Sequence, residues 1–406
     1  MYRLHEIQRL FLAPWAAFME IGSQAFSSPY SPLAYTPVSR PMAAAYQLSY
    51  RLGKDYEAPA WGISSTAVDG REIAVEDEIV VEKPFCRLTH FKRDGARDDP
   101  RVLLVAPLSG HHATLLRDTV RSLLPSHDIY ITEWVDARMV PADRGTFGLD
   151  NYVHYMLAFM RHLGAGTHVI SVCQPAPPVL AAVSLLAAAN DPAAPRTITL
   201  MGGPVDARKS PTRVNCLATT KPYEWFEQNL IYPVPARYPG AGRLVYPGFM
   251  QHAGFVAMNP GRHLRSHYEY YLHLIEGDKS DAEAHRRFYD EYNAVLDMPA
   301  RYYLETIRVI FQEFRLPLGT WALDGVPIKP AAIHRTALLT VEGELDDISG
   351  QGQTHAAHDL CSGIPPSMKE RYTVRDCGHY GIFSGSKWRQ RVCPRICAFI
   401  EKHAQG

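Results

Sequence analysis

The stretch "HVISVCQPAPPVLAAVSLLAAAN" at residues 168–190 constrains the fold more than any other part of the chain. It begins with a short run typical of a buried strand, turns at Cys173 and continues as an apolar run of helical length. The prolines of this run lie in its first turn, where a helix loses little by lacking an N–H. A buried strand that leads directly into a buried helix predicts a mostly parallel sheet covered by helices.

Other segments repeat this alternation of strands and helices. An antiparallel pair of strands is expected at 71–93, and a helix that ends at Gly164 is expected from Leu149. Further buried strands are expected at 101–110, 128–138, 196–204 and 335–347, and one more ends near "TVRDCG". We therefore expect an α/β fold in which a mostly parallel central sheet is flanked by helices.

A long insertion divides the expected core. Residues 204–330 lie between two core strands and are rich in aromatic side chains, which indicates a helical cap over the carboxyl edge of the sheet. The alternative is an ordinary helical subdomain whose aromatic residues fill its own core. The predicted organisation is an N-terminal helical segment that packs on the core (1–60), a first core part (61–203), the cap (204–330) and a last core part (331–406).

The N-terminal segment contains an amphipathic pattern, with one side of a helical wheel occupied by Leu4, Ile7, Phe11, Trp15 and Phe18. The simpler interpretation is that this side packs on the body of the protein, and the alternative is an apolar face that contacts an interface. The uncharged run at 10–19 is interrupted by a proline, so it predicts neither a signal peptide nor a membrane span.

Composition restricts the partners and the compartment. The 42 basic and 42 acidic side chains cancel, so no strong field attracts nucleic acid or an anionic membrane, and a neutral or small partner is expected. The seven cysteines are too scattered to form the framework of a small secreted domain, which favours a reducing cytosol. They form no paired CxxC set and no convincing GxGxxG or Walker loop occurs, so neither a metal nor a cofactor is expected.

Cys173 lies where a nucleophile elbow would place its reactive side chain. The turn requires small residues two positions to either side, and Ser171 and Pro175 stand there in place of the usual glycines. A buried cysteine is more often an inert small hydrophobe, but the strand before it and the helix after it favour the catalytic interpretation. A histidine and a helix N-terminus beside a thiol stabilise the thiolate, which is the nucleophile.

An α/β-hydrolase places its nucleophile, acid and histidine in that order along the chain. "TVEGELDDISG" puts Asp346 at a strand end as the expected acid, with the adjacent Asp347 in reserve, and the loop "DCGHYG" supplies His379 as the expected base. In this hypothesis His379 protonates the leaving alkoxide, and Asp346 holds the imidazole in one tautomer and stabilises its cation.

Backbone N–H groups are expected to stabilise the oxyanion. We expect one donor from Gln174 and one from the turn "APLSG", supplied by Leu108 or Ser109. His111 and His112 follow this turn. We interpret them as loop residues, and the alternative is that they border the pocket.

The segments "MYRLHEIQRLFLAPW", "SVCQPAPPVLAA", "VEGELDDISGQGQT" and "DCGHYGIFSG" together resemble the intracellular poly(3-hydroxybutyrate) (PHB) depolymerases, and the resemblance covers nearly the whole chain. In that family a cysteine replaces the serine of the extracellular depolymerases. The resemblance implies an α/β-hydrolase fold with Cys173 as nucleophile, Asp346 as acid and His379 as base.

The resemblance also implies a cytoplasmic esterase at the surface of PHB storage granules. Such an enzyme attacks the amorphous polymer chain through a thioester and releases 3-hydroxybutyrate oligomers and monomer. Thiolysis by coenzyme A, a lipase or a thioesterase remain alternatives, whereas Ser171 and Pro175 argue against a polyester synthase. A granule-binding protein without activity is the alternative from a different class, and the oligomeric state is left open.

Overall fold

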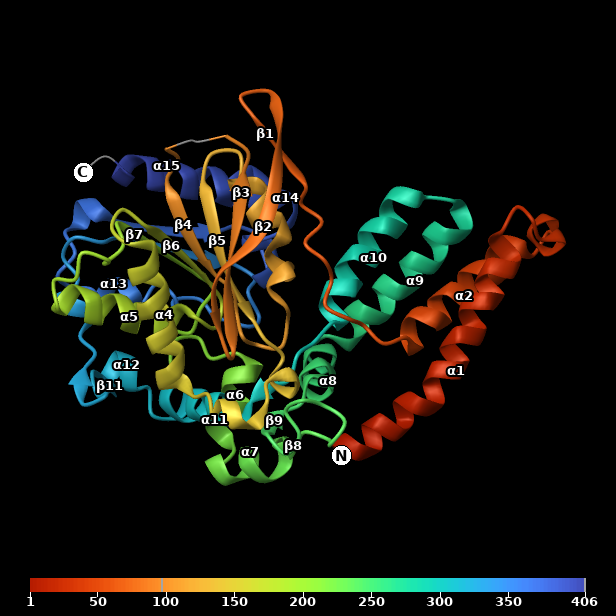
Figure 1. The fold of residues 1–406 in the computed structure, drawn as a ribbon, viewed down its shortest axis with the longest axis horizontal. Helices are drawn as coiled ribbons and strands as arrows, with labels where there is room; N and C mark the ends of the chain where they lie inside the picture. Colours follow the sequence, from red (N-terminus) through yellow and green to blue (C-terminus); the bar gives the residue numbers. More distant parts are fainter. Residues whose placement is uncertain (96–97, 405–406) are drawn as a thin grey trace.

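A computed structural model describes residues 1–95 and 98–404 of the chain. The strands of its central sheet are β1 (Ser65–Val68), β2 (Arg71–Lys83), β3 (Cys86–Arg93), β4 (Arg101–Val105), β5 (Asp128–Trp134), β6 (His168–Val172), β7 (Thr197–Met201), β13 (Ala337–Gly343) and β14 (Lys369–Val374). Within the described residues these nine strands follow the order β1-β2-β3-β5-β4-β6-β7-β13-β14 (Figure 1). The strands from β5 to β14 are parallel, and β1 to β3 form an antiparallel edge. The predicted mostly parallel sheet is confirmed.

Helices cover both faces of the sheet. They include α3 (Arg117–Leu123), α4 (Leu149–Leu163), α5 (Ala176–Ala188) and α15 (Cys393–Ala404), with the short α13 (Ala357–Leu360) and α14 (Gly385–Lys387) near the C-terminal strands. Successive residues of a strand point to opposite faces, so in β4 Leu103 and Val105 pack in the core with α4 and α5. Val102 and Leu104 pack in the opposite core with α3 and α15. The architecture is that of an α/β-hydrolase, in which functional groups lie at the carboxyl edge of the sheet.

The segment between β7 and β13, which we call the cap, is mainly helical and contains two small sheets. Its elements are α6 (Arg213–Thr220), α7 (Tyr223–Leu230), β8 (Tyr232–Pro233), β9 (Leu244–Tyr246), α8 (Gly248–Met258), α9 (Pro260–Glu276), α10 (Lys279–Asn293), β10 (Met298–Pro299), α11 (Ala300–Thr306), α12 (Arg315–Leu318), β11 (Ala322–Leu323) and β12 (Val326–Pro327). Aromatic rings join α9 to α10: the His285 ring lies 4.2 Å from Tyr270 and 4.4 Å from Tyr289 between centroids. Part of the aromatic content therefore fills the interior of the cap.

The N-terminal helices α1 (Tyr2–Ser27) and α2 (Ser39–Gly53) form a hairpin that packs on the cap. The Tyr2 hydroxyl donates to Asp297 over 2.6 Å, and Arg51 donates to Asp290 of α10 over 2.9 Å. Figure 1 shows this hairpin, in red, beside α9 and α10 and away from the central sheet. Among the helices of the described residues, none is long and apolar enough to cross a bilayer.

Much of the apolar side of α1 faces solvent, although Trp15 lies against Gly53 and Phe18 against Tyr46 of α2. Leu4 is 62% exposed, Ile7 50% and Phe11 77%. The helix does pack on the rest of the protein, but not through these three residues. The buried positions of α1 include Tyr2 and Glu6, whose polar contacts turn a different side of the helix toward the cap.

Candidate active site

Cys173 occupies the sharp turn between β6 and α5. Its backbone φ is +67°, in a region that side chains other than glycine rarely adopt. Such strain costs about 1–3 kcal/mol and is characteristic of the nucleophile elbow, which projects its side chain above the sheet. The Cys173 N–H donates to the Met201 carbonyl over 2.7 Å, and the Cys173 carbonyl accepts from the Ala176 N–H over 3.2 Å. The next strand and the following helix thus hold the turn, and the cysteine stays partly exposed.

Two glycines directly after β7 make room for this turn. A Cβ on Gly203 would lie 2.3 Å from the Ala176 Cβ and 2.5 Å from the Cys173 carbonyl oxygen. Gly202 has a φ of +55°, and a Cβ there would lie 3.1 Å from the His379 ring. These glycines are functional positions that were not expected from the sequence, although a Gly-Gly pair directly after a buried strand is a signal for them.

His379 and Asp346 form a buried pair beside the elbow. His379 follows β14, and its Nδ1 lies 2.7 Å from the Asp346 Oδ2. The other carboxylate oxygen accepts from the backbone N–H groups of Ile348 and Ser349, each over 2.9 Å. The two side chains are 4% and 1% exposed. The backbone therefore fixes the carboxylate, and the carboxylate orients the imidazole so that Nδ1–H donates to it.

The electrostatic environment of His379 favours its protonated form. Burial lowers the pKa of His379, but the Asp346 charge and then the Cys173 charge raise it, and the net effect holds this pKa well above its usual value. Cys173 is therefore close enough to His379 for the two charges to interact. The structure thus brings Cys173, His379 and Asp346 together, in an arrangement that can hold a thiolate beside an imidazolium.

The reserve carboxylate Asp347 lies elsewhere. Its Oδ2 accepts from the Asn259 side chain over 2.7 Å at an exposed position. Asp347 therefore contacts the cap, whereas its neighbour Asp346 contacts His379.

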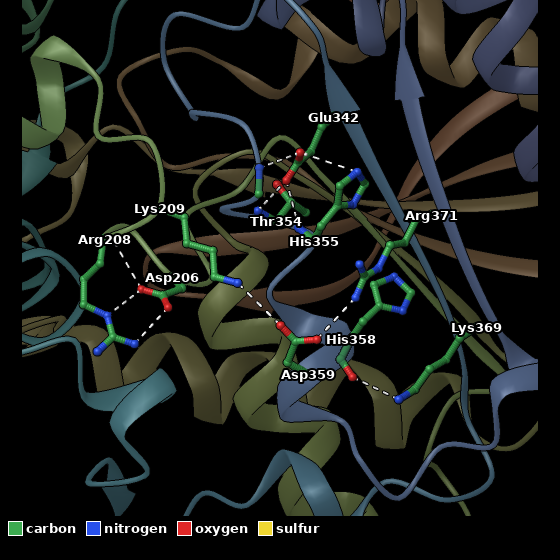
Figure 2. A network of polar contacts seen from close by, with 11 residues as sticks. Asp206, Arg208, Lys209, Glu342, Thr354, His355, His358, Asp359, Lys369 and Arg371 are labelled. Carbon is green, nitrogen blue, oxygen red and sulfur yellow. Dashed lines mark hydrogen bonds and ion pairs between the residues drawn. The ribbon is translucent and has the colours of Figure 1, made fainter.

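The loop that carries Asp346 is tied back to its own strand. Glu342 near the end of β13 is 2% exposed, and its carboxylate accepts from the backbone N–H groups of Gly352, Thr354 and His355, each over 2.8 Å. Figure 2 shows Glu342 beside Thr354 and His355. The Thr354 hydroxyl also accepts from the Gly203 N–H over 2.8 Å, which links this loop to the end of β7. Glu342 is a second supporting residue that the sequence did not indicate, because its partners are backbone groups of a loop.

Backbone donors are available on two sides of the elbow. Across residues 1–95 and 98–404, the N–H groups of Leu108, Ser109 and Gln174 donate to no protein acceptor. Leu108 and Ser109 follow β4, which pairs directly with β6 through Val105 and Ser171. The loop after β4 and the start of α5 therefore flank the cysteine with unused donors, as an oxyanion hole requires.

His111 is not the plain loop residue of the simpler interpretation. It is 3% exposed, and its ring stacks on Phe255 of α8 with 5.0 Å between centroids. His112 is only partly buried.

Comparison with known proteins places these observations in context. A family model described as the PHB depolymerase C-terminus matches residues 202–404. A comparison with curated proteins gives no match. Solved structures with a similar arrangement include a hydrolase from Pseudomonas aeruginosa at 14% identity and a TM-score of 0.46, which covers 80% of this chain and 98% of that one. A thermophilic esterase from Thermogutta terrifontis, at 14% identity and a TM-score of 0.42, covers 84% and 98%.

Proposed function

Because the chain belongs to the PHB depolymerase family, whose members are ester hydrolases, we propose that it hydrolyses the ester bonds of amorphous PHB through Cys173, His379 and Asp346. The observation that carries this proposal is a cysteine at a strained elbow beside a buried histidine–carboxylate pair. Family membership supports the substrate class, and this geometry supports the chemistry.

The reaction proceeds in two acyl-transfer steps. The Cys173 thiolate attacks the ester carbonyl carbon, and the oxyanion accepts hydrogen bonds from the N–H of Gln174 and from that of Leu108 or Ser109. As the tetrahedral intermediate collapses, the carbon–oxygen bond breaks and His379 gives its proton to the leaving alkoxide. A thioester on Cys173 and a shorter polymer alcohol result.

Hydrolysis of the thioester returns the enzyme to its starting state. His379, now neutral, accepts a proton from water as the water oxygen attacks the thioester carbonyl. The carbon–sulfur bond then breaks, the thiolate re-forms and the shortened 3-hydroxybutyrate acid leaves. Asp346 stabilises the imidazolium whenever it forms.

The deciding experiment measures turbidity loss and released 3-hydroxybutyrate from an amorphous PHB emulsion. We compare the unsubstituted protein with Cys173→Ala and with the matched control Cys216→Ala, which removes an exposed thiol far along the chain. Release that is lost only in Cys173→Ala supports the proposal. Release that requires coenzyme A would make the thiol of coenzyme A the acyl acceptor. Emulsion binding without release from any form would favour a granule-binding protein, and turnover of only triglyceride or acyl-CoA would favour a lipase or a thioesterase.

The proposed place of action is the surface of a PHB granule in the cytoplasm. The exposed side of α1 supports contact with it, since Leu10 is 65% and Phe11 77% exposed and a polyester surface is apolar and uncharged. Replacing both with Gln should weaken sedimentation with PHB granules and leave hydrolysis of soluble p-nitrophenyl butyrate unchanged. Val326→Gln, at a residue that is 53% exposed on β12, is the control. Equal granule binding by the α1 double variant and by Val326→Gln would show that α1 does not contact the granule.

A further inference from the structure

His111 carries a buried ring nitrogen that the proposed mechanism does not use. Within the described residues its Nε2 has no hydrogen-bond partner, although the side chain is almost completely buried. An unpaired buried polar atom costs free energy comparable to a lost hydrogen bond. Because the ring is shielded from solvent, only a group that enters the fold beside Phe255 and Tyr292 can pair with Nε2.

The fold places this nitrogen close to the reaction centre. His111 stands two residues after Ser109, in the loop that offers the oxyanion donors. Its ring centroid lies 5.5 Å from that of Tyr292, which lies 6.2 Å from that of Tyr380, the residue after His379. This loop is fastened to the cap: the Leu296 N–H donates to the Gly110 carbonyl over 2.7 Å, and His111 forms a β-bridge with Val295. The imidazole thus lies where the oxyanion loop, the cap and the catalytic histidine approach one another.

The chemistry of Nε2 follows from the contacts of the ring. Burial lowers the pKa of His111 to about 4, so the imidazole is neutral near pH 7. The backbone carbonyl of Tyr292 acts in the opposite direction and raises this pKa, and Nδ1 is the ring nitrogen that can donate to it, because Nε2 has no partner. A neutral imidazole whose proton is on Nδ1 has a lone pair on Nε2, which can accept a hydrogen bond. The matching ligand group is a hydrogen-bond donor.

We propose that His111 Nε2 accepts a hydrogen bond from the free 3-hydroxyl group of the acyl unit bound at Cys173. This inference rests on the proposed function. A 3-hydroxybutyryl unit has a free hydroxyl group only at the hydroxyl end of the polymer or of an oligomer, because every other 3-oxygen is esterified. His111 thereby makes the site selective for the hydroxyl end of the chain, with Phe255 and Tyr292 confining the ring.

The test compares kcat/KM for p-nitrophenyl 3-hydroxybutyrate and p-nitrophenyl butyrate, which differ in this hydroxyl group alone. His111→Phe retains an aromatic ring against Phe255 and removes the acceptor, so the preference for the hydroxylated ester should fall roughly 3- to 10-fold. His111→Gln, whose amide oxygen is an acceptor, should restore part of the preference. His112→Phe is the control and should leave the preference unchanged. Thermal melting of each variant shows that it is folded.

Three results would overturn the inference. Equal losses on both esters with accumulation of acyl-enzyme would assign Nε2 to the water of deacylation. Equal losses with a lowered melting temperature in both His111 variants would make the histidine structural. An unchanged preference of His111→Phe for the hydroxylated ester would show that His111 does not bind the 3-hydroxyl group. Activity of the unsubstituted protein on p-nitrophenyl butyrate, abolished by Cys173→Ala, tests the proposed function separately.

Discussion

Two adjacent carboxylates provide a sharp test of the site. Asp346→Asn retains the size of the side chain, and the amide oxygen can still accept from Ile348 and Ser349, whose N–H groups require an acceptor. The amide NH₂ group then faces His379 Nδ1. That nitrogen must become the acceptor, so the proton moves to Nε2, the nitrogen that should accept from the thiol.

The expected loss follows from this rearrangement. Removing a hydrogen bond to a charged group, here 2.7 Å long, costs about 1.5–3 kcal/mol, or roughly 10- to 150-fold in rate. The wrong tautomer adds to this loss, up to about 10⁴-fold in the serine-protease precedent. We therefore expect kcat/KM for p-nitrophenyl butyrate to fall roughly 10²- to 10⁴-fold. Asp347→Asn, which alters an exposed contact with Asn259, should change it less than about twofold.

The pH profile gives a second readout of the same variant. His379 supplies the proton for the leaving alkoxide, so activity should decline as pH rises through its pKa, which Asp346 and Cys173 hold well above the usual value. The neutral amide of Asp346→Asn removes the negative charge that raises the pKa of His379. The alkaline limb of the kcat/KM profile should therefore move to lower pH. Equal effects of Asp346→Asn and Asp347→Asn, or a larger effect of the latter, would refute the assignment of the acid.

Three other substitutions test the supporting structure. Gly203→Ala should displace the elbow at Cys173, and overpacking should lower the unfolding free energy by about 1–3 kcal/mol. The displaced Cys173 should also react more slowly with iodoacetamide. An unchanged melting temperature and an unchanged alkylation rate would contradict this reasoning. Glu342→Gln should weaken the charge-assisted hydrogen bonds to the loop that carries Asp346, and so lower both the melting temperature and kcat. A loss of kcat without a lower melting temperature would indicate that Glu342 takes a direct part in the reaction. Asp136 lies shortly after β5 and pairs with Arg138 over 2.9 Å. Burial and then the nearby Asp297 carboxylate raise the pKa of Asp136 to about 7, so in the folded protein it retains a proton that the unfolded chain loses near pH 4. Stability should therefore fall between about pH 4 and 7, by up to roughly 1.4 kcal/mol per pH unit, and melting curves of Asp136→Asn should show a smaller decline.

Much of the fold was predictable because local patterns determine it. The strand, turn and helix around Cys173 are each specified by residues close in sequence, and β6 and α5 lie where the pattern predicts them. The order of Cys173, Asp346 and His379 along the chain predicted their roles, since consecutive parallel strands deliver their ends to one edge of a sheet. The sequence ranked Asp346 ahead of Asp347, and the loop geometry directs Asp346 to His379 and Asp347 to Asn259, since adjacent residues point in different directions.

The orientation of α1 and the burial of His111 also could not be predicted from local sequence patterns. A helical wheel shows that Leu4, Ile7 and Phe11 share a side, but it does not show which side meets the cap. In the structure, the hydrogen bond from Tyr2 to Asp297 fixes that orientation, although the two residues are far apart in the chain. His111 likewise lies in a loop whose burial depends on the cap.

Hydrophobic periodicity and turn chemistry act over short distances, and they are enough to specify the parallel sheet, the elbow and the ordered set of catalytic candidates. The three-dimensional fold adds which carboxylate meets His379, why Gly202 and Gly203 must lack side chains and where His111 is enclosed. These features depend on contacts between distant strands, loops and the cap, and packing in three dimensions selects them.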